Sequence, residues 1–143
     1  MDGRMTGRRE HDERGFTLLE ILVVIAILGL LIGLVAPAAL RQLGFARVSV
    51  AKQSIERIGS VLDMYKLDVG TYPDTEQGLR ALVERPAGLT AWNGPYIKGG
   101  VPVDPWNHPY SYRDPSTRNG HDYDLCSAGP PGATVSADAI CNP

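Results

Sequence analysis

Residues 14–40 read RGFTLLEILVVIAILGLLIGLVAPAAL, and this stretch decides the fold of the chain. After Glu20 it contains no ionisable side chain, and an apolar run of about 18 residues or more is typical of a membrane-spanning helix. From Phe16 to Leu40 the helix would be roughly 37 Å long, which covers a hydrocarbon core of about 30 Å with some tilt. Glu20 needs a partner, because a carboxylate deep in a bilayer costs about 2.5–3.5 kcal/mol.

Three kinds of N-terminal segment compete for residues 1–40. A secretory signal peptide has an apolar region of about 7–15 residues, which is shorter than this run, and Pro37 disrupts the small-residue cleavage signal around it. A plain single-span anchor accounts for the length but leaves Glu20 unexplained. The third is a leader that a peptidase removes ahead of the apolar run, between Gly15 and Phe16.

The third alternative rests on a resemblance. A glycine, an aromatic residue and a glutamate stand at fixed spacing before an unbroken apolar helix, and this order resembles the leader of type IV pilins and type II secretion pseudopilins. In that superfamily a prepilin peptidase cuts after the glycine and methylates the new terminal phenylalanine. The resemblance implies cleavage between Gly15 and Phe16 and N-methylation of Phe16. Residues 1–15 would be the leader, 16–40 the transmembrane and assembly helix, and 41–143 the head.

Cleavage at this position would also supply the missing partner of Glu20. The new α-amine of Phe16 carries a positive charge over much of the physiological pH range. Opposite charges attract strongly in a low-dielectric site, where each alone is costly. We therefore expect each helix to lend its amine to Glu20 of a neighbour, which neutralises both charges and sets the stagger between subunits.

Small and helix-breaking residues recur every four positions within the apolar run, at Gly29, Gly33 and Pro37. The two glycines allow helices to approach closely. Pro37 lacks a backbone donor, so the helix is expected to kink or loosen near Gly33, and the resemblance implies that this stretch can unwind inside filaments. The alternative is an ordinary membrane helix, in which glycine and proline are common.

After the apolar run, the pattern predicts that the helix continues into the head. From Arg41 to about Leu67 apolar residues recur at helical spacing, and Gly70 suits the left-handed position that ends a helix. One rod of about 50 residues is expected, with a single buried stripe. The stripe consists of Val48, Ala51, Ile55, Ile58, Leu62 and Tyr65.

The rest of the head is expected to cover that stripe. Asp74 and Gln77 have the spacing of a capping box for a second, short helix that Pro86 would stop. Residues 110–112 and 123–126 alternate polar and apolar side chains, as the strands of a small antiparallel hairpin do. The predicted fold class is α+β, with a small antiparallel sheet packed on a long N-terminal helix.

Two further blocks narrow the resemblance to one family. Residues 62–86, LDMYKLDVGTYPDTEQGLRALVERP, and residues 94–112, GPYIKGGVPVDPWNHPYSY, closely resemble the major pseudopilins of type II secretion. The resemblance implies a homo-oligomeric helical filament that drives folded proteins across the outer membrane. It implies a single pass through the bacterial inner membrane with a periplasmic C-terminal domain. The implied partners are the prepilin peptidase, minor pseudopilins, the inner-membrane assembly platform and membrane lipid. The alternative is a type IV pilin for adhesion, motility or DNA uptake.

The two cysteines, Cys126 and Cys141, are expected to form a disulfide if this part of the chain is exported; otherwise they would be free thiols. Closing such a loop corresponds to roughly 3 kcal/mol in the chain-entropy model. The resemblance also implies a calcium site here, but Asp138 is the one carboxylate that matches, and calcium prefers about six to eight oxygens. Asp122 or Asp124 could add a ligand. We expect the disulfide to replace the ion, with both fastenings present as the alternative.

Other function classes find little support in the sequence. The formal net charge is −2 and no Lys/Arg run follows Arg14, which argues against a nucleic-acid partner. No G-x-S-x-G, P-loop, paired-cysteine zinc motif or H-x-x-x-H spacing is found. We expect no enzyme and no cofactor; a binding or catalytic domain on a plain anchor is the alternative.

Overall fold

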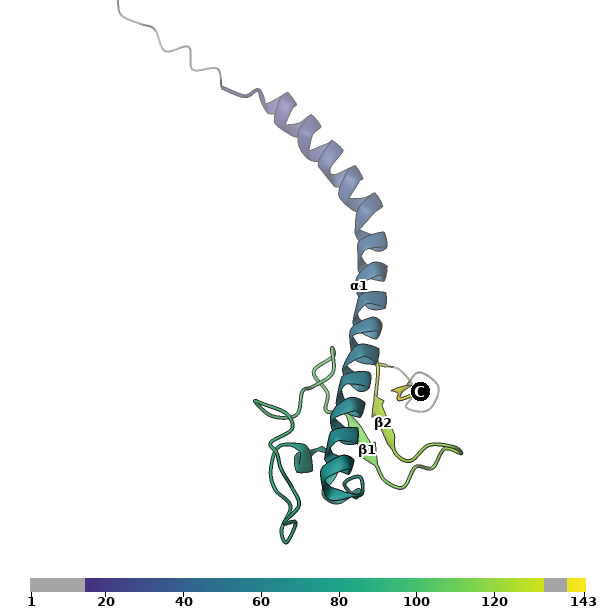
Figure 1. Ribbon diagram of the computed structural model, residues 1–143. Helices are drawn as coiled ribbons and strands as arrows, with labels where there is room; N and C mark the ends of the chain where they lie inside the picture. The colour runs from purple at the N-terminus through teal and green to yellow at the C-terminus, as the bar shows by residue number, and fades with distance from the viewer. Residues whose placement is uncertain (1–14, 133–138) are drawn as a thin grey trace, which may run out of the picture. The chain divides into compact units, whose positions relative to one another are not determined.

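The computed structural model describes residues 15–132 and 139–143. The chain forms two units, the first ending at Leu40 and the second running from Arg41 to Pro143. The predicted α+β class is confirmed, with one long helix and a small antiparallel sheet (Figure 1). The elements are α1 (Leu18–Val69), the 3-10 helix η1 (Gly78–Leu82), β1 (Ser111–Arg113), β2 (Asp124–Ser127) and β3 (Ile140–Cys141).

The part of α1 that belongs to the first unit, Leu18 to Leu40, is exposed along its whole length. Every side chain from Gly15 to Leu40 is solvent-accessible, and α1 is long and apolar enough to cross a membrane. Thr17 caps the helix, because its Oγ1 accepts a hydrogen bond from the Glu20 amide at 3.2 Å. Pro37 lies inside α1 without ending it. The loosening expected near this proline within a filament stays a prediction.

In the second unit, the predicted apolar stripe of α1 forms one side of the core from Ala51 to Tyr65, whereas Val48, predicted to begin the stripe, is only half-buried. Leu62 is fully buried, and the sheet and the loops pack over the stripe on this part of α1. Gly59 leaves room for this cover, since a Cβ at that position would lie 3.0 Å from the Tyr123 hydroxyl oxygen. The buried core residues are Ala51, Ile55, Ile58, Leu62, Tyr65, Leu79, Ala81, Leu82, Trp92, Tyr110 and Leu125.

The sheet has the order β1-β2-β3, and both pairings are antiparallel. The predicted hairpin is confirmed as β1 and β2, with Tyr112 opposite Leu125. The third strand was not expected. Its two residues pair with the end of β2, which places Cys141 opposite Cys126. Ile140 and Cys141, close to the C-terminus, are thereby part of the sheet.

The second helix differs from the prediction. The two hydrogen bonds of the capping box form: the Gln77 amide donates to Asp74 Oδ1 at 2.7 Å and the Asp74 amide donates to Gln77 Oε1 at 3.2 Å. The helix itself begins only at Gly78, is of the 3-10 type and ends at Leu82, short of Pro86. Gly78 has φ 57°, in the left-handed region, and this conformation interrupts an α-helical ladder. A short 3-10 turn is what remains.

Candidate functional site

The predicted processing segment lies just ahead of α1. Gly15, Phe16 and Thr17 have no regular secondary structure, and Phe16 is 78% exposed. Glu20 lies in the first turn of α1, where a carboxylate interacts favourably with the positive end of the helix dipole. The peptide bond between Gly15 and Phe16 is therefore in accessible, non-helical chain, as proteolytic sites usually are.

Within the part of the chain that the structure describes, no neighbouring atom requires glycine in the apolar run. A Cβ at Gly29 or Gly33 would meet nothing within 4 Å, and the same holds at Gly15. A glycine in a helix interior costs about 0.5–1 kcal/mol relative to alanine, because it loses more backbone freedom on folding. The open surface around Gly29 and Gly33 is thus available for a neighbouring helix. The assembly role of these two residues stays a prediction.

The side chains around these glycines are apolar on all sides of the helix. Exposed patches of this size are unusual on a protein that is surrounded by water. Lipid or other helices are the surroundings that suit them. The large exposed apolar residues of this part include Leu18, Leu19, Ile25, Leu30, Ile32, Leu34 and Leu40.

A second candidate site lies at the C-terminal edge of the sheet. Cys126 and Cys141 form a disulfide across β2 and β3, which confirms the predicted pairing and excludes the free-thiol alternative. The bond joins residues 15 positions apart in the sequence. It fixes β3, a strand too short to hold its register by backbone hydrogen bonds alone.

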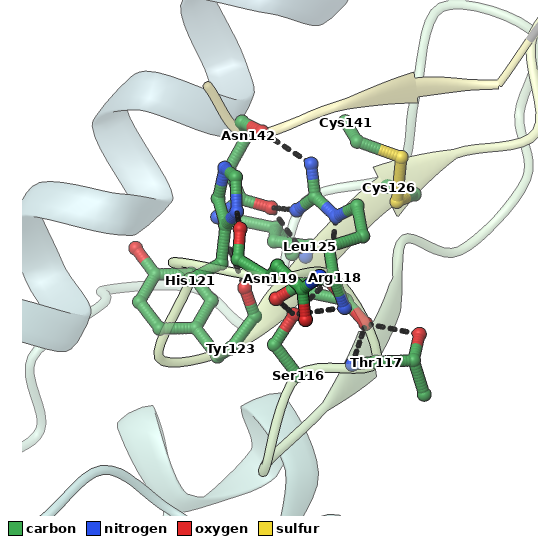
Figure 2. Close-up of polar contacts among 11 residues, drawn as sticks. Ser116, Thr117, Arg118, Asn119, His121, Tyr123, Leu125, Cys126, Cys141 and Asn142 are labelled. Carbon is green, nitrogen blue, oxygen red and sulfur yellow. Dashed lines mark hydrogen bonds and ion pairs between the residues drawn. A yellow bond between two sulfur atoms is a disulfide. The ribbon is translucent and has the colours of Figure 1, made fainter.

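Beside the disulfide, Arg118 joins three parts of the chain (Figure 2). Its Nε donates to Asp124 Oδ1 at 2.6 Å, its Nη1 donates to the Asn142 carbonyl oxygen at 2.8 Å, and its Nη2 donates to Asn142 Oδ1. The Asn142 side chain also accepts from the Leu125 amide at 2.8 Å and donates to the Tyr123 carbonyl at 3.1 Å. We call Arg118, Asp124, Asn142 and the disulfide the C-terminal latch.

Asp124 accepts further hydrogen bonds from the turn that precedes it. The donors are Ser116 Oγ at 2.6 Å, the Thr117 amide at 2.9 Å and Thr117 Oγ1 at 3.0 Å. Burial opposes ionisation of Asp124, but these hydroxyl and amide donors and the guanidinium outweigh it and hold the pKa of this carboxyl well below its usual range. The carboxylate is therefore ionised at neutral pH, and both of its oxygens accept hydrogen bonds from the protein.

Another carboxylate, Asp104, is buried and ties residues 104–106, the DPW block, to the sheet. Ser127 Oγ donates to Asp104 Oδ2 at 2.6 Å, while the amides of Trp106 and His108 donate to Oδ1 at 3.0 and 2.8 Å. Asp104 is 3% exposed and Ser127 0%. Burial raises the pKa of Asp104, but the bond from Ser127 and the two backbone bonds together lower it below its ordinary value. The Gly129 amide donates to Ser127 Oγ, which extends the network into the following loop.

These two aspartates predict the acid sensitivity of the head. Both pKa values are lowered by folding, so their contribution to the free energy of unfolding is present above the ordinary aspartate value of about 3.9 and is lost as the pH falls below it. We expect the melting temperature, followed by tryptophan fluorescence, to be steady from neutral pH to about pH 5 and to fall below about pH 4. The Asp124→Asn variant should show a shallower fall. A wild-type melting temperature that holds into strong acid contradicts this assignment.

Among the described residues, the side chains near the disulfide do not form the set of about six to eight oxygen ligands that calcium prefers. Across residues 15–132 and 139–143, no group of three His, Cys, Asp or Glu side chains could hold a metal ion. Asp124 is saturated by its donors, and Asp122 faces Lys66 Nζ at 3.7 Å. The Ser127 hydroxyl is committed to Asp104. Asp138, the matching carboxylate, lies outside the described residues.

Two residues of the latch, Arg118 and Asn142, could not be predicted from the sequence. Arg118 stands in a turn-like stretch with no periodicity, and Asn142 lies beyond the expected elements. Their contact spans 24 positions, which no local pattern reports. Asp104 carried one signal, since it opens the DPW block on which the family resemblance partly rests.

Comparison with known proteins agrees with this geometry. The family model described as "Type II secretion system (T2SS), protein G" matches residues 38–142, and the prokaryotic N-terminal methylation motif matches residues 11–36. The type II secretion system core protein G of Pseudomonas aeruginosa is 44% identical over 133 residues, covering 91% of this chain and 92% of that protein. The core protein G of Escherichia coli K12 is 42% identical over 139 residues, covering 94% of each.

A solved structure shows the same fold. The crystal structure of the major pseudopilin from the type 2 secretion system of enterohaemorrhagic Escherichia coli superposes with a TM-score of 0.60 at 35% identity. The match covers 72% of this chain and 91% of that one. These findings favour the pseudopilin prediction over the type IV pilin alternative. The chain belongs to the protein G family of type II secretion systems, and it is a major pseudopilin, the structural subunit of the secretion pseudopilus.

Proposed function

We propose that the subunits assemble through a charge pair between the α-amine of a processed Phe16 and Glu20 of a neighbouring subunit. The observation that carries this proposal is Glu20 itself, the one ionisable side chain from Phe16 to Leu40 of a helix that is exposed and otherwise uncharged. Gly29 and Gly33 let the neighbouring helices approach closely enough for many contacts along the same face. The paired charges set the stagger, and apolar packing supplies the assembly energy.

We further propose that the leader stays in the cytoplasm and the head lies in the periplasm, with one pass through the inner membrane. The disulfide supports this orientation, since such bonds persist in the periplasm and are rare in the cytosol. A periplasmic head also places the pseudopilus where it can drive folded proteins toward the outer membrane.

The partners follow from this arrangement. A prepilin peptidase would remove residues 1–15 and methylate Phe16, and the inner-membrane platform and minor pseudopilins would start and support the filament. Lipid surrounds the subunit before it assembles. We propose a structural role without catalysis and without a nucleic-acid partner, which the net charge of −2 supports.

N-terminal sequencing of the mature membrane protein tests the processing step. We expect a chain that begins methyl-Phe-Thr-Leu-Leu-Glu, because the bond after Gly15 is exposed and non-helical. The Gly15→Leu variant should retain the leader, whereas Gly44→Ala, a matched glycine within α1, should be processed normally. An intact Met1 on the wild-type membrane form would refute the proposal and favour a plain anchor.

A further inference from the structure

We infer that the head is fastened by the guanidinium of Arg118 acting as a built-in cation, so that its C-terminal segment keeps its place without calcium. This inference goes beyond the filament function and concerns how the subunit is made rigid. It starts from the latch, where one side chain on the turn between β1 and β2 reaches both β2 and the residue after β3 (Figure 2).

The geometry suits a permanent positive charge. Arg118 is 34% exposed and Asp124 14%, so the ion pair is partly withdrawn from water and is screened less than a surface pair. Three guanidinium nitrogens donate, one to a carboxylate and two to the backbone and side-chain oxygens of Asn142. A planar fork of this kind holds several acceptors at fixed positions, as a bound ion does.

The same contacts leave a second cation no place at Asp124. Both carboxylate oxygens already accept hydrogen bonds, from Ser116, Thr117 and Arg118. Calcium at this carboxylate would have to displace those donors and would lie close to the guanidinium, where like charges repel. The described part of the loop after β2, residues 128–132, adds no carboxylate or hydroxyl.

The disulfide fastens the same two strands one residue away. Cys126 follows Leu125 in β2, and Cys141 precedes Asn142. The Asn142 amide donates to the Leu125 carbonyl at 2.9 Å, which continues the β2–β3 pairing past the disulfide. The covalent bond restricts the unfolded chain, whereas the guanidinium acts in the folded state. The two fastenings are therefore independent in mechanism.

The test uses the full chain in detergent, with or without residues 1–15, and thermal unfolding is followed by the fluorescence of Trp92 and Trp106. The wild-type melting temperature is expected to be the same in excess CaCl2 and in excess EDTA. Arg118→Gln should lower it by roughly 5–10 °C in both buffers, because Asp124 and Asn142 lose their shared donor. Arg113→Gln, an exposed arginine on β1 with the same change of charge, should leave it within about 1 °C.

A local measurement guards against a variant that fails to fold. Hydrogen exchange of the peptide that contains residues 139–143 should be slow in the wild-type chain whether calcium or EDTA is present. It should quicken in Arg118→Gln but not in Arg113→Gln. A wild-type head that melts several degrees earlier in EDTA, or that exchanges faster there, overturns the inference. So do equal melting temperatures of the two arginine variants. None of these results depends on cleavage or filament assembly, so they stand apart from the test of the proposed function.

Discussion

Glu20→Ala is expected to abolish filament assembly while leaving membrane insertion intact. Removing a carboxylate from the apolar run makes insertion easier by up to about 2.5–3.5 kcal/mol. It also leaves the α-amine of each processed Phe16 without an acidic partner in the neighbouring subunit. Carbonate extraction should still find the variant in the membrane fraction. Sheared filaments and exported protein in the medium should both be absent.

The matched control is Glu56→Ala, which removes an exposed carboxylate from the same helix within the head. It should assemble normally. N-terminal sequencing of the Glu20 variant shows whether loss of assembly follows from the missing charge pair or from failed processing. Normal filaments from a processed Glu20→Ala chain would end the charge-pair hypothesis.

Asp104→Ala is expected to have the largest effect on the stability of the head. The substitution removes the acceptor of three hydrogen bonds, so the buried Ser127 hydroxyl and two amides lose the group to which they donate. The free energy of unfolding should fall by roughly 3–5 kcal/mol. That is a large part of the 5–15 kcal/mol or so that holds an ordinary domain together. Urea unfolding of the processed chain, followed by tryptophan fluorescence, measures the change.

Two further substitutions calibrate this result. Asp104→Asn keeps an oxygen for the two backbone amides but presents an amide group to Ser127, so an intermediate loss is expected. Asp122→Ala removes a carboxylate whose side chain is 70% exposed and should cost no more than about 1 kcal/mol. If Asp104→Ala is as mild as Asp122→Ala, the buried network does not support the head as described.

The features that could be predicted from the sequence are those signalled by a local repeat or by a specific residue type. The stripe from Ala51 to Tyr65 repeats at helical spacing over many turns, so its burial followed from the pattern. The alternation around Tyr112 and Leu125 predicted the hairpin, and two cysteines together with the export that the resemblance implies predicted the disulfide. Each of these signals either repeats over several residues or is chemically specific, so tertiary packing did not override it.

The features that could not be predicted depend on contacts that local sequence patterns do not encode. Strand β3 has two residues, too few for any alternation to show. The short helix read as α-helical because capping spacing does not reveal that Gly78 adopts a positive φ. Arg118 acquires its role only when Asn142, far along the chain, pairs beside Leu125. Long-range polar contacts of this kind become visible only in three dimensions.

The open space around Gly29 and Gly33 affects how flexible the isolated subunit is. Each glycine adds backbone freedom to α1, and a Cβ at either position would meet none of the described residues within 4 Å. An isolated subunit is therefore more flexible in this stretch than it would be with alanine at both positions. We therefore expect a subunit that is free in the bilayer to be softer at these two positions than a subunit whose apolar helix is covered by neighbouring helices.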